Sequence, residues 1–160
     1  MSGNIFAQKI DSKYLTALIY LKTDTSINQE IQKFKKHWLK KEVNNNDFNL
    51  SEYISYMPVP YLDEKLEDND FEVNAQLHKE KYYFDTEQNI KFKGLIPFVK
   101  SNLYLLFSKP INNYLVAEFA INTTGNEIDM IENGPIIHLL FIFDENDLVK
   151  NLYVSYSYFN

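Results

Sequence analysis

Two ionisable residues of this chain occupy matching places in two apolar segments. Glu118 lies in the segment 114–121 and His138 in the segment 136–143, and the alternate positions on either side of each are apolar. If these segments are neighbouring strands in a suitable register, the carboxylate and the imidazole meet on one concave, aromatic-lined sheet face, where they have the parts needed for general acid–base catalysis. The alternative is a solvated Glu118 and a simply packed His138, because strand register cannot be deduced from one sequence.

An acidic run provides a second candidate site. Six carboxylates and one lysine lie between residues 63 and 72, together with the apolar residues Leu66 and Phe71. The simplest interpretation is a solvated charge run. The functional interpretation is a contact surface that pairs with the lysines and arginines of a basic protein. The acidic residues of this predicted surface are Asp63, Glu64, Glu67, Asp68, Asp70 and Glu72.

The C-terminal segment 149–159 alternates like a strand and is rich in tyrosine. The alternation places Tyr156 and Tyr158 on one face and Tyr153 on the other. Tyrosine offers rigid area with a polar tip, which suits a protein interface. It is also an ordinary strand residue. Tyr153, Tyr156 and Tyr158 therefore join the predicted partner-binding set, with a plain core-and-solvent role as the alternative.

Several other kinds of chemistry are excluded by composition. The chain has no cysteine, which excludes disulfides, thiolate metal sites and a cysteine nucleophile. His37, His78 and His138 are far apart and never at metal-ligand spacing. With 4 glycines in the chain, a glycine-rich phosphate loop is hard to build, and no serine nucleophile elbow occurs. We expect neither a metal nor a cofactor.

The charge balance favours a basic partner. All 16 basic residues are lysine and 22 residues are acidic, which gives a net charge of -6. Without the planar guanidinium fork of arginine, the chain is a poor candidate for direct nucleic-acid binding. Opposite net charge steers encounter with a basic protein, although a net charge of this size also simply keeps a protein soluble.

The N-terminus lacks the features of a signal peptide, and the longest early apolar stretch is too short to span a bilayer. We therefore expect a cytoplasmic protein with no membrane contact. A second copy of the chain remains an alternative partner.

The helical signals fall in the first half of a predicted single domain over residues 1–160, with a helical part at about 12–85. Ser12 and Ser26 are the predicted N-caps of two helices. The apolar residues Ile27, Ile31, Phe34 and Trp38 then follow helical spacing and predict the face that packs on a sheet, with the lysines of that helix left in water. A further short helix is predicted over 51–57.

The strand signals fall at about 89–159. The segments 103–107 and 114–121 predict one hairpin, and the segments 136–143 and 149–159 predict another. Together these elements predict an α+β fold in which N-terminal helices pack on a C-terminal antiparallel sheet of about four strands.

Two functions fit this reading. Small size, acidity and the absence of catalytic motifs resemble the general character of bacterial immunity proteins, which neutralise a toxin by occluding its active site. The resemblance implies a non-enzymatic module that binds a basic partner. The order of elements is similar to that of the cone-shaped folds of the NTF2-like kind, and this likeness implies the alternative of a pocket protein that binds or converts a small molecule through Glu118 and His138.

Overall fold

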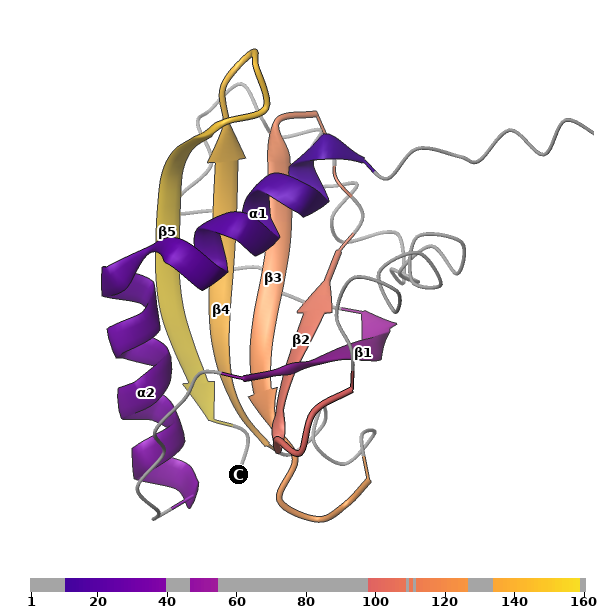
Figure 1. The fold of residues 1–160 in the computed structure, drawn as a ribbon, viewed down its shortest axis with the longest axis vertical. Coiled ribbons are helices and arrows are strands. Elements are labelled where there is room, and N and C mark those ends of the chain that lie inside the picture. Colours follow the sequence, from indigo (N-terminus) through magenta and orange to yellow (C-terminus); the bar gives the residue numbers. More distant parts are fainter. Residues whose placement is uncertain are drawn as a thin grey trace, which may run out of the picture.

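The computed structural model describes residues 11–39, 47–54, 98–108, 110, 112–126 and 134–158, without the side chains of residues 52–54, 157 and 158. Two helices, α1 (Ser12–Thr23) and α2 (Thr25–Leu39), precede strand β1 (Asn49–Ile54). The strands β2 (Leu103–Phe107), β3 (Tyr114–Ile121), β4 (Pro135–Phe143) and β5 (Val149–Tyr158) follow. The predicted α+β order, with helices first and sheet last, is confirmed (Figure 1).

The sheet has five strands in the order β1-β2-β3-β4-β5. Strands β2 to β5 form an antiparallel meander, as the two predicted hairpins require. Strand β1 pairs with β2 in parallel, so the sheet is mixed and has one strand more than expected. Residues 51–54 belong to this strand, and the helix predicted over 51–57 is wrong in that part.

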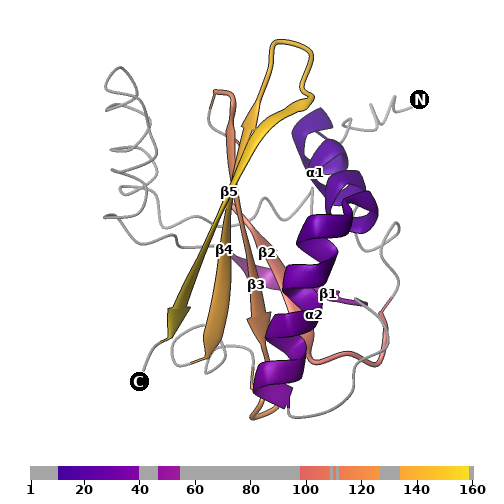
Figure 2. The ribbon, with the colours of Figure 1, turned by 90° about the vertical axis from the view of Figure 1, so that its left-hand side faces the viewer.

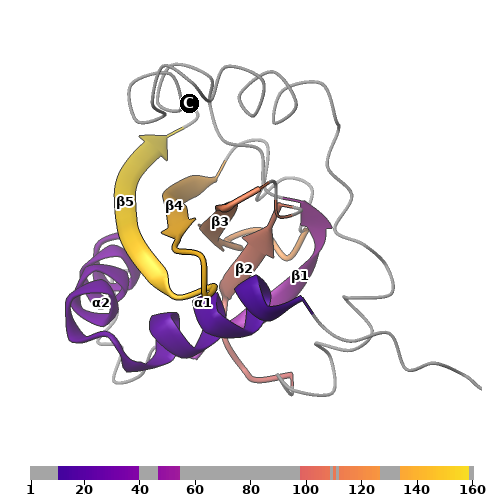
Figure 3. The same ribbon diagram turned by 90° about the horizontal axis from the view of Figure 1, so that it is seen from above.

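Both helices lie on the same side of the sheet (Figure 2), where α1 crosses the strands and α2 runs beside β5 (Figure 3). In α1 the buried residues recur at helical spacing, and in α2 the residues Ile27, Ile31 and Phe34 are buried. Trp38 packs against the same core at its margin. The predicted apolar stripe of α2 therefore does face the sheet, because burying it removes the most apolar area from water.

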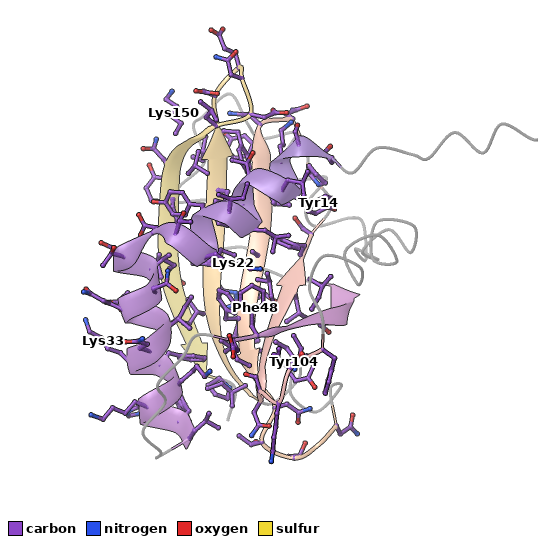
Figure 4. The ribbon with its side chains drawn as sticks, in the orientation of Figure 1. Tyr14, Lys22, Lys33, Phe48, Tyr104 and Lys150 are labelled. Atoms are coloured by element: carbon purple, nitrogen blue, oxygen red, sulfur yellow. The ribbon has the colours of Figure 1, made fainter. Side chains whose placement is uncertain are left out.

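The core between helices and sheet is apolar and rich in aromatic rings. Tyr14 of α1 meets Phe107 of β2 edge-on, with the ring centroids 5.3 Å apart, and its hydroxyl donates to the carbonyl of Ser108 over 3.0 Å. Figure 4 shows Tyr14 on α1 and Phe48 in the middle of the molecule, where the Phe48 ring meets Phe119. Apolar side chains fill this layer, so the polar candidates must lie elsewhere.

One lysine of α2 departs from the expectation that the lysines of this helix stay in water. Lys35 is 3% exposed, whereas Lys33 and Lys36 on either side are exposed. Its Nζ lies 3.4 Å from the carbonyl oxygen of Asp47. Burial lowers the pKa of Lys35, and the nearby Asp47 charge opposes that shift. Burial wins because water no longer stabilises the ammonium group.

Candidate functional site

The register of β3 and β4 places Glu118 directly opposite His138. Residues opposite each other in an antiparallel pair project from the same sheet face, with their Cβ atoms about 5 Å apart. The Nδ1 atom of His138 lies 2.8 Å from Oε1 of Glu118, which is hydrogen-bond distance. Both residues are 1% exposed. The structure thus brings the two candidate acid–base residues into direct contact.

The pair lies on the sheet face that points away from α1 and α2. The odd-numbered residues of β3 and β4 belong to the core beneath the helices, so Glu118 and His138 project the other way. Their neighbours on this second face are apolar and buried, and Tyr104 packs against them. The buried neighbours are Leu106, Val116, Ala120, Ile136 and Leu140. The surroundings are mainly aliphatic, in contrast to the aromatic lining expected from the sequence.

The contact determines which ring nitrogen carries the hydrogen. An ionised carboxylate only accepts hydrogen bonds, so Nδ1 of His138 must donate to Glu118. In the neutral imidazole the lone pair then resides on Nε2, and that atom is the base. The carboxylate also stabilises the imidazolium that forms when Nε2 takes up a proton. This arrangement can move a proton at one defined atom.

The three candidate tyrosines of β5 do not form one surface. Tyr156 faces the helix side, is 42% exposed, and donates a 2.5 Å hydrogen bond to Oε2 of Glu30 on α2. That bond, with a further one from Lys33, holds the pKa of Glu30 below its usual range. Tyr153 pairs with Leu140 and shares the face of Glu118 and His138. The Tyr158 side chain lies outside the described side chains.

The six candidate acidic residues between positions 63 and 72 lie outside the described residues. In the part of the chain that is described, no group of three or more His, Cys, Asp or Glu side chains is arranged to hold a metal ion. Within the same ranges, neither helix combines the length and the apolar character needed to cross a bilayer.

Similarity to known proteins adds nothing to these observations. No family model, curated protein or solved structure matches the chain. Any statement about function therefore rests on the residues themselves.

Two features of the structure were not predicted from the sequence. Ser155 of β5 lies opposite His138 and so extends the polar row by one strand. Strand parity could have placed Ser155 on a face, but not in this row, because the pairing of β4 with β5 sets the register. The burial of Lys35 also had no local signal, since its neighbours in sequence are lysines that stay exposed.

Proposed function

We propose that the protein is an α+β small-molecule-binding protein whose polar site is the Glu118–His138 pair. The observation that carries this proposal is the 2.8 Å contact between Nδ1 and Oε1 of two side chains that are each 1% exposed. Ligand sites typically combine an apolar lining with a few well-placed polar groups. The second face of the sheet has this composition around the pair.

Stability alone does not account for the pair. Taking a carboxylate and an imidazole out of water costs several kcal/mol, and replacing a buried ion pair by apolar residues of similar size is often neutral or stabilising. Every immediate neighbour of the pair on β3 and β4 is apolar, so an apolar pair would suit this face. A chemical use for the imidazole supplies the reason to keep two polar groups here.

The geometry also indicates the class of ligand. With its Nδ1 hydrogen directed at Glu118, a neutral His138 accepts a hydrogen bond at Nε2. The preferred ligand is therefore a small molecule that carries a hydroxyl, amine or amide N–H group on an apolar body. If that hydrogen is acidic enough, the same contact makes His138 a general base.

The test is a thermal-shift screen of small phenols, alcohols, amines and amides against the full chain. Binding to the folded state raises its melting temperature. We expect at least one compound to stabilise the wild type and the His37→Gln variant, but not the His138→Gln variant. His37 is the matched control because it is an exposed histidine on α2. Equal stabilisation of both variants, or no stabilising compound at all, would contradict the proposal.

A second candidate function rests on charge. In it, the protein is a non-enzymatic, immunity-type module that occludes a basic partner with the carboxylates of residues 63–72. Its support is the net charge of -6 and the six acids in this segment. The experiment is capture on immobilised basic proteins at low salt, comparing the wild type with a variant in which the six acids are replaced by Asn or Gln. Binding that weakens with salt and with neutralisation supports this function, and unchanged binding would refute the assignment to this segment.

A further inference from the structure

Three polar side chains form one row across three neighbouring strands. Glu118 of β3 pairs with His138 of β4, and His138 pairs with Ser155 of β5. Directly opposed residues share a face in an antiparallel sheet, so all three project from the side away from the helices. The row continues on β2 with Leu106, which is apolar. The polar set therefore has the order carboxylate, imidazole, hydroxyl.

We propose that Ser155 is a nucleophile activated by His138, with Glu118 as the residue that orients the imidazole. This inference rests on the proposed function and deepens it by naming the substrate class as activated carboxylic esters. Sites of this kind are recognised by geometry and roles, independently of the fold that carries them. The 2.8 Å contact between Nδ1 and Oε1 supplies the orienting half of the arrangement.

The chemical step is an acyl transfer. The Ser155 Oγ attacks the ester carbonyl carbon, and its proton passes to Nε2 of His138. The carbon–oxygen bond to the leaving alcohol then breaks, and the proton on Nε2 passes to that alcohol. Water attacks the resulting acyl-serine by the same route, which releases the carboxylic acid and restores the Ser155 hydroxyl. No oxidant, reductant or metal is consumed.

Burial distinguishes the members of the row in the way this role requires. Glu118 and His138 are buried, whereas Ser155 is half-buried on the terminal strand of the described sheet, where a substrate can approach it. Among the described residues no hydrogen bond joins Ser155 to His138. A rotation about the Cα–Cβ bond of Ser155 is needed to form one, and such contacts often tighten only when substrate binds.

The first test uses a fluorophosphonate, which forms a phosphorus–oxygen bond to an activated serine and releases fluoride. We expect one adduct per chain, located on Ser155 by peptide mass spectrometry. The adduct should be absent in Ser155→Ala and formed about 10²-fold more slowly in His138→Gln, because general-base catalysis contributes a factor of that size. It should persist in Ser26→Ala, the matched control at an exposed serine of α2.

The second test uses the absence of cysteine from the chain. Ser155→Cys introduces a single thiol, and a neighbouring imidazolium favours its reactive thiolate form. We expect iodoacetamide to alkylate this variant faster than Ser26→Cys, and to lose that advantage when His138→Gln is added. Melting temperatures establish that each variant is folded.

The outcomes separate the two proposals. If Ser155 forms no adduct and Ser155→Cys reacts no faster than Ser26→Cys, the nucleophile assignment is overturned, while ligand stabilisation that depends on His138 still supports the binding site. If that stabilisation is also missing, the proposed function fails as well.

Discussion

Lys35, Glu118 and His138 are almost fully buried, although each carries a group that water stabilises strongly when charged. Their situations differ. Glu118 and His138 face each other across a strand pair at hydrogen-bond distance. Lys35 has lost most of its hydration and its ammonium group lies near a backbone carbonyl. At the residue scale, the first case is an energetically coupled pair and the second is a local penalty.

The coupling of Glu118 and His138 can be measured by a double-mutant cycle. Glu118→Leu or His138→Leu alone leaves one buried polar group without this partner, and each should lower the free energy of unfolding by about 3–5 kcal/mol. The double variant should be more stable than the sum of the two losses predicts, because neither polar group remains. Urea denaturation of the four proteins gives the coupling energy. Strictly additive losses would contradict a coupled pair.

Lys35→Met should stabilise the protein at pH 7. The folded-state pKa of Lys35 is lowered by burial, so the unfolded chain binds its proton more tightly between the lowered pKa and about 10.4. Folding is therefore penalised below this range, and the penalty disappears as pH rises through it. The gain from Lys35→Met should exceed the ~0.5 kcal/mol scatter of surface substitutions at pH 7 and shrink above pH ~10. Lys36→Met, at an exposed lysine of the same helix, is the control and should have little effect at either pH.

At the element scale, aspartates rather than serines begin the two helices. The Asp11 carboxylate accepts the backbone N–H of Lys13 over 2.8 Å, and the Asp24 carboxylate accepts that of Ile27 over 2.9 Å. The predicted caps Ser12 and Ser26 are therefore wrong by one and two residues. An aspartate accepts the free N–H groups as a serine does, and its charge also interacts favourably with the helix dipole.

Asp24 has a double role at the junction of the helices. Its backbone N–H bonds the carbonyl of Tyr20 at the end of α1, while its side chain caps α2. Asp24→Ala should therefore lower the free energy of unfolding by about 1 kcal/mol, within the range known for lost N-caps. Ser26→Ala should be close to neutral. Thermal denaturation followed by circular dichroism compares the two, and a larger loss from Ser26→Ala would show that the serine is the cap.

The turn between β4 and β5 is tied to the start of α1. Asp147 forms an ion pair of 2.8 Å with Lys13 and a hydrogen bond with Ser12, and these bonds lower the pKa of Asp147. Because the folded-state pKa is depressed, the stabilisation is present above the unfolded pKa of about 3.9 and is lost as pH falls through the folded value.

Asp147→Asn should therefore lower the melting temperature at pH 7 and make little difference at pH ~2. Asparagine suits this test because Asp147 has a φ of 58°, and asparagine tolerates the left-handed region well. Glu145→Gln, at an exposed position of the same turn, should leave the melting temperature unchanged at both pH values. An equal effect of Asp147→Asn at both pH values would contradict the ionic origin of the contact.

At the scale of the whole molecule, one apolar core joins α1, α2 and all five strands or their margins. The face of the sheet away from the helices is also buried along β3 and β4. Phe141 is central to this arrangement, since it is 0% exposed and its ring meets Tyr20 of α1 and Phe143 of β4. A shared core of this kind predicts that helices and sheet unfold together.

The chain has one tryptophan, Trp38, which packs against the core from α2. Its fluorescence and the far-ultraviolet circular dichroism should therefore give the same urea midpoint. Phe141→Ala should move both midpoints together and cost about 3–5 kcal/mol, although Phe141 is on β4 and the fluorescent probe is on α2. Two separate midpoints would show that the helices and the sheet are independent units.

The sequence alone was sufficient wherever one segment carries its own pattern. Strands 103–107 and 114–121 match the predicted bounds, and the apolar stripe of α2 faces the core. Alternation also placed Glu118 and His138 each on a strand face. These properties depend on side-chain periodicity and near-neighbour contacts, which a single segment contains in full.

Only the tertiary structure decided which segments meet and in what register. The parallel pairing of β1 with β2 joins residues far apart in sequence, and nothing in either segment announces it. The alignment of Glu118, His138 and Ser155 in one row likewise depends on two strand registers. A shift of one residue would move a whole strand to the opposite face. The elements follow from local periodicity, whereas the candidate site exists because non-local packing selects one register among several.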